Sequence, residues 1–205
     1  MRTRLATLLV LLLTAGAPRA EVIDRVLAIV DGTLVTLSDV RAAVVLQLVA
    51  VPDRGDPLEA GLERWIDRLL VLQEVERFAP PEPDPAVVNV RLADVLSRLG
   101  PPEVRRRQLE ALGVSEAWLR DWVRDDLRIQ AYIDQRFSGS LEPTDEELEN
   151  YARENPGAFG GEGQLTPADE QAIARTGAMA ARQRALVADW VDGLRRRAEI
   201  LRPSR

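Results

Sequence analysis

The pattern of apolar residues is clearest in residues 58–78, where it has the period of an α-helix. One side of that helix carries Leu58, Leu62, Trp65, Leu69 and Leu72. A second apolar patch, on the opposite side of its last two turns, consists of Val71, Val75 and Phe78. Because a helix with apolar residues on two sides needs neighbours on both, this stretch predicts the central helix of the fold.

A β-hairpin is predicted near the start of the chain. Residues 22–30 and 33–36 are rich in β-branched residues and flank Asp31-Gly32, a dipeptide typical of a type I′ turn. Residues 199–201 form another short apolar run at the other end of the chain. Since exposed strand edges are usually paired or covered, we expect this run to pair with one edge of the hairpin.

Helices are predicted for most of the remaining chain. Capping residues, prolines and glycines bound them at residues 86–99, 103–112, 116–137, 144–154 and 167–198. Gly177 is expected to interrupt the last helix softly. Trp190 and Leu194, near the end of that helix, are expected to pack on the central helix. Their expected neighbours there are Trp65 and Leu69. The predicted fold is therefore mainly α, a helical core with a small N-terminal β-hairpin that pairs with a C-terminal strand.

Residues 39–50, a predicted helix capped by Ser38 and Asp39, are apolar on nearly every side. Such a helix is either buried all round or presents an apolar surface to a partner, and the sequence leaves both readings open. In the second case, the predicted peptide-binding residues are Val45, Leu48 and Val49.

Residues 1–20 have the pattern of a secretory signal peptide. Arg2 and Arg4 precede an apolar run over residues 5–13, followed by small residues up to Ala20. That run is shorter than the about 20 residues that a membrane-spanning helix needs. Without residues 1–20, which contain three arginines and no acid, 24 basic residues face 33 acidic ones, a net charge of −9. We therefore expect an exported protein with no membrane span and no nucleic-acid partner.

The chain contains no His, no Cys and no Lys, and this excludes most catalytic and metal-binding chemistry. Nucleophilic triads, imidazole or thiolate metal sites and lysine Schiff bases each need one of these residues. Asp126 lies within the apolar stripe of helix 116–137, where we expect an arginine to pair with it. A hydrolase that uses Asp126 with the acids around Asp145 is the one enzymatic alternative. No catalytic residue, cofactor or metal is predicted.

Three stretches together resemble the N-terminal domain of SurA-type periplasmic chaperones, the trigger-factor-like family that escorts outer-membrane proteins. They are the hairpin VIDRVLAIVDGTLVTLSDV, the central helix LERWIDRLLVLQEVERF and the helix LRDWVRDDLRIQAYI. The later stretches TDEELENYARENPGAF and ADWVDGLRRRAEIL extend the resemblance. It covers most of residues 21–159 and about 180–202.

In that family one or two parvulin prolyl-isomerase domains usually follow the segment that ends here at Phe159. Residues 160–166 form only a short predicted linker in that place, so the resemblance implies a chaperone core without an isomerase domain. Residues 21–159 would form the helical domain, and residues 167–205 would return to complete it. The resemblance implies a periplasmic protein that binds unfolded outer-membrane or periplasmic proteins. We expect this binding in an apolar groove between the helical core and a hinged arm. The alternative is an envelope assembly subunit that docks one dedicated partner, which includes a helix-exchanged homodimer.

Overall fold

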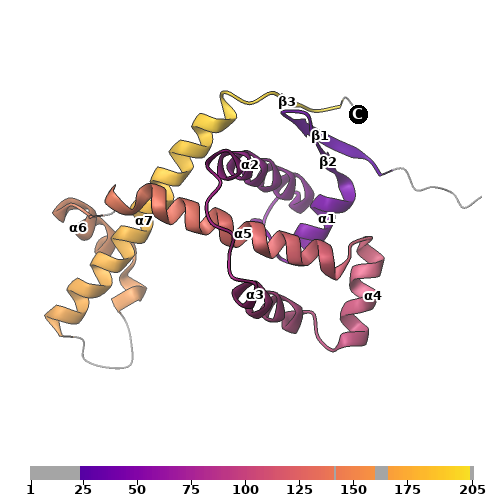
Figure 1. The fold of residues 1–205 in the computed structure, drawn as a ribbon. Helices are drawn as coiled ribbons and strands as arrows, with labels where there is room; N and C mark the ends of the chain where they lie inside the picture. The colour runs from indigo at the N-terminus through magenta and orange to yellow at the C-terminus, as the bar shows by residue number, and fades with distance from the viewer. Residues whose placement is uncertain (1–23, 141, 160–165, 204–205) are drawn as a thin grey trace, which may run out of the picture.

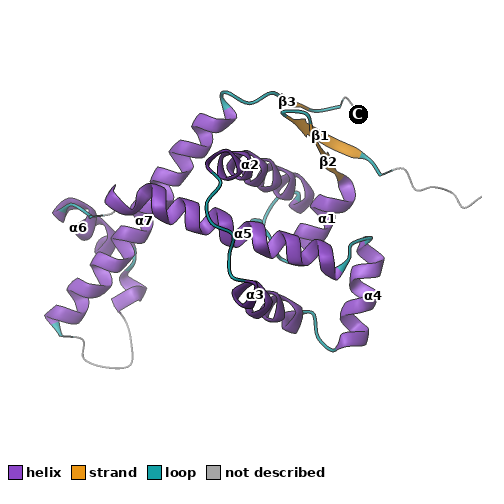
Figure 2. Cartoon of the chain, viewed as in Figure 1, coloured by secondary structure: helices purple, strands orange, loops and turns teal. Residues whose placement is uncertain are grey.

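The computed structural model describes residues 24–140, 142–159 and 166–203, and over these residues the predicted fold is confirmed. The chain is mainly helical, with a small antiparallel sheet formed by both of its ends (Figures 1 and 2). The predicted signal peptide and residues 160–165 of the predicted linker lie outside the described residues. The division into signal peptide, helical domain, linker and C-terminal segment stays a prediction.

The boundaries of the helices follow their capping residues. In chain order the elements are β1 (Val26–Val30), β2 (Thr33–Thr36), α1 (Leu37–Val45), α2 (Pro57–Phe78), α3 (Pro85–Arg98), α4 (Pro102–Leu112), α5 (Glu116–Phe137), α6 (Asp145–Glu154), α7 (Pro167–Arg195) and β3 (Ile200–Leu201). Short 3-10 turns follow α5 at Ser138–Ser140 and α6 at Pro156–Phe159. Among the described residues, every α-helix except α4 begins with an N-cap residue whose side-chain oxygen accepts a backbone N–H. These local bonds are readable from sequence, which explains why most predicted ends are correct within a few residues.

The hairpin turns at Asp31 and Gly32, as predicted. Both residues have positive φ, 45° and 83°, which a type I′ turn requires. The register between β1 and β2 shifts between Val26 and Ala28, so a β-bulge places Leu27 as an extra residue on β1.

The C-terminal strand pairs with β1, which makes the sheet order β2-β1-β3. The paired residues are Ile29 with Leu201 and Val30 with Ile200. Just beyond them, the Asp31 N–H donates to the Glu199 carbonyl at 2.9 Å. The predicted return of the chain end to the hairpin is therefore confirmed, but over two residue pairs only.

Helix α2 lies at the centre of the main core and contacts α1, α5, α7 and β1. Its buried apolar residues are Leu62, Trp65, Ile66, Leu70, Val71 and Val75. Phe78, predicted to lie in the second buried patch, is instead 59% exposed because α2 ends there. Helix α1 approaches α2 closely at Gly61, where any side chain would overlap Val44. The central role predicted for this helix is confirmed.

The N-terminal half of α5 joins α2 to two smaller apolar clusters. Trp118 and Trp122 contact Trp65 of α2, with ring centroids 6.2 and 4.9 Å apart. Beyond them, α3 packs on Leu119 and Val123 of α5, and Leu109 of α4 packs on α1. Trp118 contributes to all three clusters, and so does Leu48.

The helix predicted at residues 39–50 corresponds to α1 (Leu37–Val45), which begins earlier and is shorter than predicted. Thr36, not Ser38 or Asp39, is its N-cap, because the Ser38 backbone and hydroxyl bind the Asp24 carboxylate. The helix ends at Val45 because Gln47 adopts a left-handed conformation (φ 53°) and the Leu48 N–H donates to the Ala43 carbonyl at 2.8 Å. This is a Schellman ending, in which the apolar residue after the turn packs back onto the fold.

Helix α7 differs from prediction at two places. It continues through Gly177, where the Tyr151 ring of α6 occupies the space that a side chain would need, so the glycine serves close packing. Leu194 is buried in the core cluster of Trp65, as predicted. The rings nearest to Trp190, however, are Tyr132 and Phe137 of α5. Helix α6 and the first half of α7 project from the core as an arm (Figure 1).

Candidate functional site

A groove of about 730 Å³ opens where the sheet, the start of α2 and the C-terminal segment meet. Its lining residues are Arg25, Val26, Leu27, Asp56, Leu58, Glu59, Leu62, Arg202 and Pro203. Arg202 and Pro203 lie 140 or more positions after the other lining residues, so the groove is complete only because β3 returns to β1.

The floor of the groove is aliphatic. Leu58 and Leu62 lie one turn apart on α2, where the Asp56 side chain caps the helix by accepting the Leu58 N–H at 2.9 Å. Leu62 is buried, whereas Leu58 and Leu27 are half-buried. The floor is thus continuous with the core but partly open to water, which suits burial of an apolar side chain from a bound molecule.

One wall of the groove is the edge of β1 that β3 leaves uncovered. Continuing the register of β3 beyond Leu201 would place Pro203 opposite Leu27. Proline has no N–H to donate, so the ladder stops before reaching Val26 and Leu27. Among the described residues, the first half of β1 therefore has a partner strand on the β2 side only.

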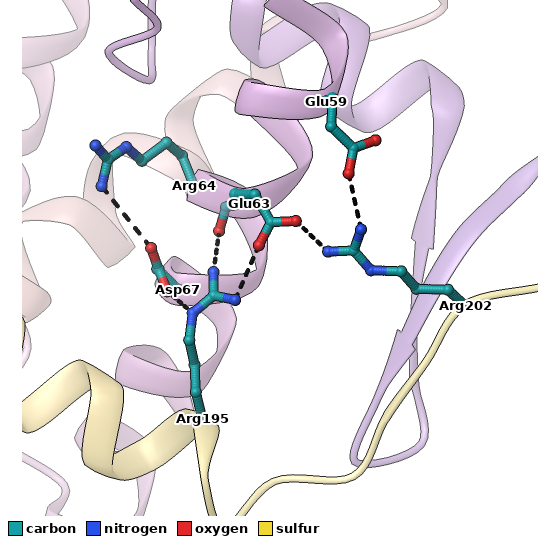
Figure 3. Close-up of polar contacts among 6 residues, drawn as sticks. All are labelled: Glu59, Glu63, Arg64, Asp67, Arg195 and Arg202. Carbon is teal, nitrogen blue, oxygen red and sulfur yellow. Dashed lines mark hydrogen bonds and ion pairs between the residues drawn. The ribbon is translucent and has the colours of Figure 1, made fainter.

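A cluster of ion pairs holds the C-terminal segment against α2 beside this groove (Figure 3). Arg202 donates to Glu59 at 2.7 Å and also to Glu63. Arg195 donates to the Glu63 carboxylate and to its carbonyl, both at 2.9 Å, and to Asp67. We call these five residues the C-terminal clamp.

The clamp changes the ionisation of its central carboxylate. Partial burial raises the pKa of Glu63, but hydrogen bonds and charges from Arg202 and Arg195 outweigh burial and hold that pKa below its ordinary value. In return, the hydrogen bond to Glu63 raises the pKa of Arg202. Both partners are thus favoured in their charged forms.

We expect the clamp to weaken in acid. Because the folded-state pKa of Glu63 is lowered, its contribution is complete above the ordinary glutamate pKa, about 4.3, and is lost as the pH falls through the lower folded value. The side chain is 37% exposed, so solvent screening limits the contribution to about 1 kcal/mol or less. Urea unfolding should show Glu63→Gln to be less stable than wild type at pH 7, with the difference shrinking in acid. The exposed Glu76→Gln on the same helix is the control, and a pH-independent difference for Glu63→Gln would contradict the assignment.

Asp126 has the arginine partner that the sequence predicts. Arg68 donates to the Asp126 carboxylate at 3.1 Å and to the Trp122 carbonyl at 2.8 Å. Its guanidinium also lies 3.7 Å from the centre of the Trp122 ring. Burial lowers the pKa of Arg68, with Asp126 opposing that shift.

The acids near Asp145 occupy a different place, at the start of α6 on the arm (Figure 1). Glu147 accepts the Thr144 N–H in a capping box and also accepts from Arg182 at 2.8 Å. Asp126 and Glu147 are therefore bound by different partners on different helices, and each has a structural role.

The three predicted peptide-binding residues differ in exposure, and their role in binding stays a prediction. Val45, the last residue of α1, is 57% exposed. Leu48 and Val49 follow the helix and are half-buried against the core, and neither lines the groove described above. Sequence reasoning missed the groove, although Pro203 after the short strand was a signal that strand pairing would stop.

No family model and no curated protein matches this sequence. In the described part of the chain, no helix combines the length and apolar character needed to cross a membrane.

Proposed function

We propose that the protein is a periplasmic chaperone that binds extended apolar segments of unfolded exported proteins, outer-membrane proteins above all, without catalysing prolyl isomerisation. The observation that carries this proposal is the groove in which the aliphatic floor of α2 meets an uncovered strand edge. Such a site suits a polypeptide more than a compact small molecule, because it offers apolar surface and backbone hydrogen-bonding groups along one line.

The groove also suits weak and reversible binding. Burial of one or two large apolar side chains contributes about 1.5–3 kcal/mol each, and part of that is offset by the lost freedom of the bound segment. Arg25, Asp56, Glu59 and Arg202 give its rim both signs of charge, which favours no single sign of charge in a bound segment. The resemblance to the SurA N-terminal domain supports the same assignment.

Aggregation of a chemically unfolded β-barrel membrane protein tests this function. We expect the purified protein to suppress light scattering after dilution of the denaturant, in the absence of nucleotide. Leu58→Ser should require severalfold more protein for the same suppression, because it removes half-buried apolar surface from the groove floor. Val90→Ser is the matched control, since Val90 is 65% exposed on α3, outside the groove.

Two results would count against the proposal. One is failure to suppress aggregation when the protein is in large molar excess over the unfolded client. The other is an equal loss of suppression in Leu58→Ser and Val90→Ser. Cis-trans isomerisation of a proline peptide should proceed at its uncatalysed rate in the same preparation. Acceleration would contradict the isomerase-free part of the proposal.

A second function, docking of one dedicated envelope partner, is favoured by the outer face of the sheet. Ile29 is paired with both Leu34 and Leu201, and directly paired residues point to the same face of a sheet. Leu34 is 56% and Leu201 is 51% exposed, so the three side chains form an apolar row across the strands. Crosslinking in envelope extracts separates the two functions, because a chaperone is captured with many precursors and an assembly subunit with one partner.

A further inference from the structure

We infer that the groove binds its polypeptide as an added β-strand, which pairs antiparallel with the uncovered half of β1 and carries apolar residues at every second position. This inference rests on the proposed function, because it specifies how the groove would hold an unfolded chain.

The Val26 N–H faces the uncovered edge of β1. The Arg25 carbonyl accepts the Leu37 N–H at 2.8 Å, so it points to the β2 side of β1. In a planar trans peptide the N–H points opposite to the carbonyl, and the described residues contain no cis peptide bond. The Val26 N–H therefore points away from β2, toward the edge where β3 has ended, and it has no partner among the described residues.

The uncovered edge continues an existing hydrogen-bonded ladder. The Asp31 N–H, on the same edge of β1, donates to the Glu199 carbonyl of the returning chain. One edge of β1 is thus paired at its end and unpaired at its start, with Pro203 at the boundary. An added strand would continue the ladder at the position where proline prevents this chain from doing so.

Side chains of an added strand would reach the groove floor. Residues of an added strand alternate between its two faces, so every second one would point to Leu58 and Leu62 on the groove floor. The intervening ones would point to the opposite face, away from α2. A segment with apolar residues at alternate positions matches this geometry. Membrane-spanning strands of β-barrels have that pattern, which connects the binding mode to the proposed clients.

The experiment uses the full-length mature protein and a fluorescent nine-residue peptide with alternating Val/Leu and Ser/Thr residues. Affinity is measured by anisotropy, with a peptide of equal composition but clustered apolar residues for comparison. Val26→Pro removes the edge N–H without removing a bond to β2, and Val26→Ile is the matched control that keeps it. Two peptides carrying N-methyl groups on one or the other set of alternate residues test the same contact without altering the protein.

Backbone pairing predicts that the alternating peptide binds more tightly than the clustered one. Val26→Pro and one of the two N-methyl sets should each weaken binding roughly threefold to tenfold, as loss of one or two hydrogen bonds does. Val26→Ile and the other N-methyl set should bind as the parent pair does. The Val26 amide should also exchange with solvent more slowly when peptide is bound.

The contrary results separate the inference from the proposed function. If the affinity for the peptide is unchanged by Val26→Pro and by both sets of N-methyl groups, strand addition is wrong. The groove would then bind the peptide through its side chains alone. No binding of either peptide, together with no suppression of aggregation, would overturn the proposed function itself. A peptide-free dimer that Val26→Pro dissociates would show that a second copy occupies the edge, and would also overturn the inference.

Discussion

Deletion of residues 178–205 is expected to abolish cooperative unfolding of the protein. It removes Leu194, which is buried in the main core, with Trp190 and Ile200, which pack against that core. Burial of each such side chain is worth about 1.5–3 kcal/mol, and a whole domain is stable by only about 5–15 kcal/mol. The deletion also uncovers β1 along its whole free edge and removes both arginines of the C-terminal clamp.

Thermal unfolding followed by circular dichroism and by tryptophan fluorescence measures this effect. A shorter deletion, of residues 202–205, is the control because it keeps α7 and β3 and loses only the Arg202 part of the clamp. That variant should keep one sharp transition at a slightly lower temperature. A sharp transition in the longer deletion would mean that α7 is an appendage and not part of the core.

Leu48→Ser is expected to destabilise the fold by at least about 2 kcal/mol, whereas Val45→Ser should change stability by less than about 0.5 kcal/mol. Leu48 packs against all three apolar clusters, so its replacement opens a space where they meet and places a hydroxyl there. Val45 is 57% exposed at the end of α1. Urea unfolding of the two variants measures the difference.

The same pair of variants tests the contact surface that the sequence predicts at Val45, Leu48 and Val49. If Val45→Ser weakens suppression of aggregation while keeping wild-type stability, Val45 belongs to a contact surface. If Leu48→Ser keeps wild-type stability, the packing role assigned to Leu48 is wrong.

The sequence by itself determined the local elements of this protein. The Asp31-Gly32 turn, the caps at Ser115, Thr144 and Thr166, and the apolar stripe of α2 were all predictable. Each depends on atoms within a few residues of one another, or on a period that repeats along one helix. The pairing of Asp126 with an arginine was predictable for a different reason, because a carboxylate in an apolar stripe requires a partner.

Only the tertiary structure decided where α1 ends and what its last residues contact. Residues 39–50 contain neither Gly nor Pro to mark a boundary. The helix stops at Val45 in a Schellman ending that places Leu48 against all three apolar clusters. The contact of Tyr151 with Gly177 could not be predicted from the sequence either, because the two residues lie on different helices.

The candidate site belongs to this second category, although the return of the chain end to the hairpin was predicted from the sequence. Its clamp joins Glu59 and Glu63 to arginines 132 to 143 positions later in the chain. Its uncovered strand edge exists because β3 pairs with two residues of β1 and then meets Pro203. The number of residue pairs between β1 and β3 depends on where α7 ends relative to the sheet. Helices α2 and α5 set that position because they pack against α7. The pattern of apolar residues within a single segment carries no information about it.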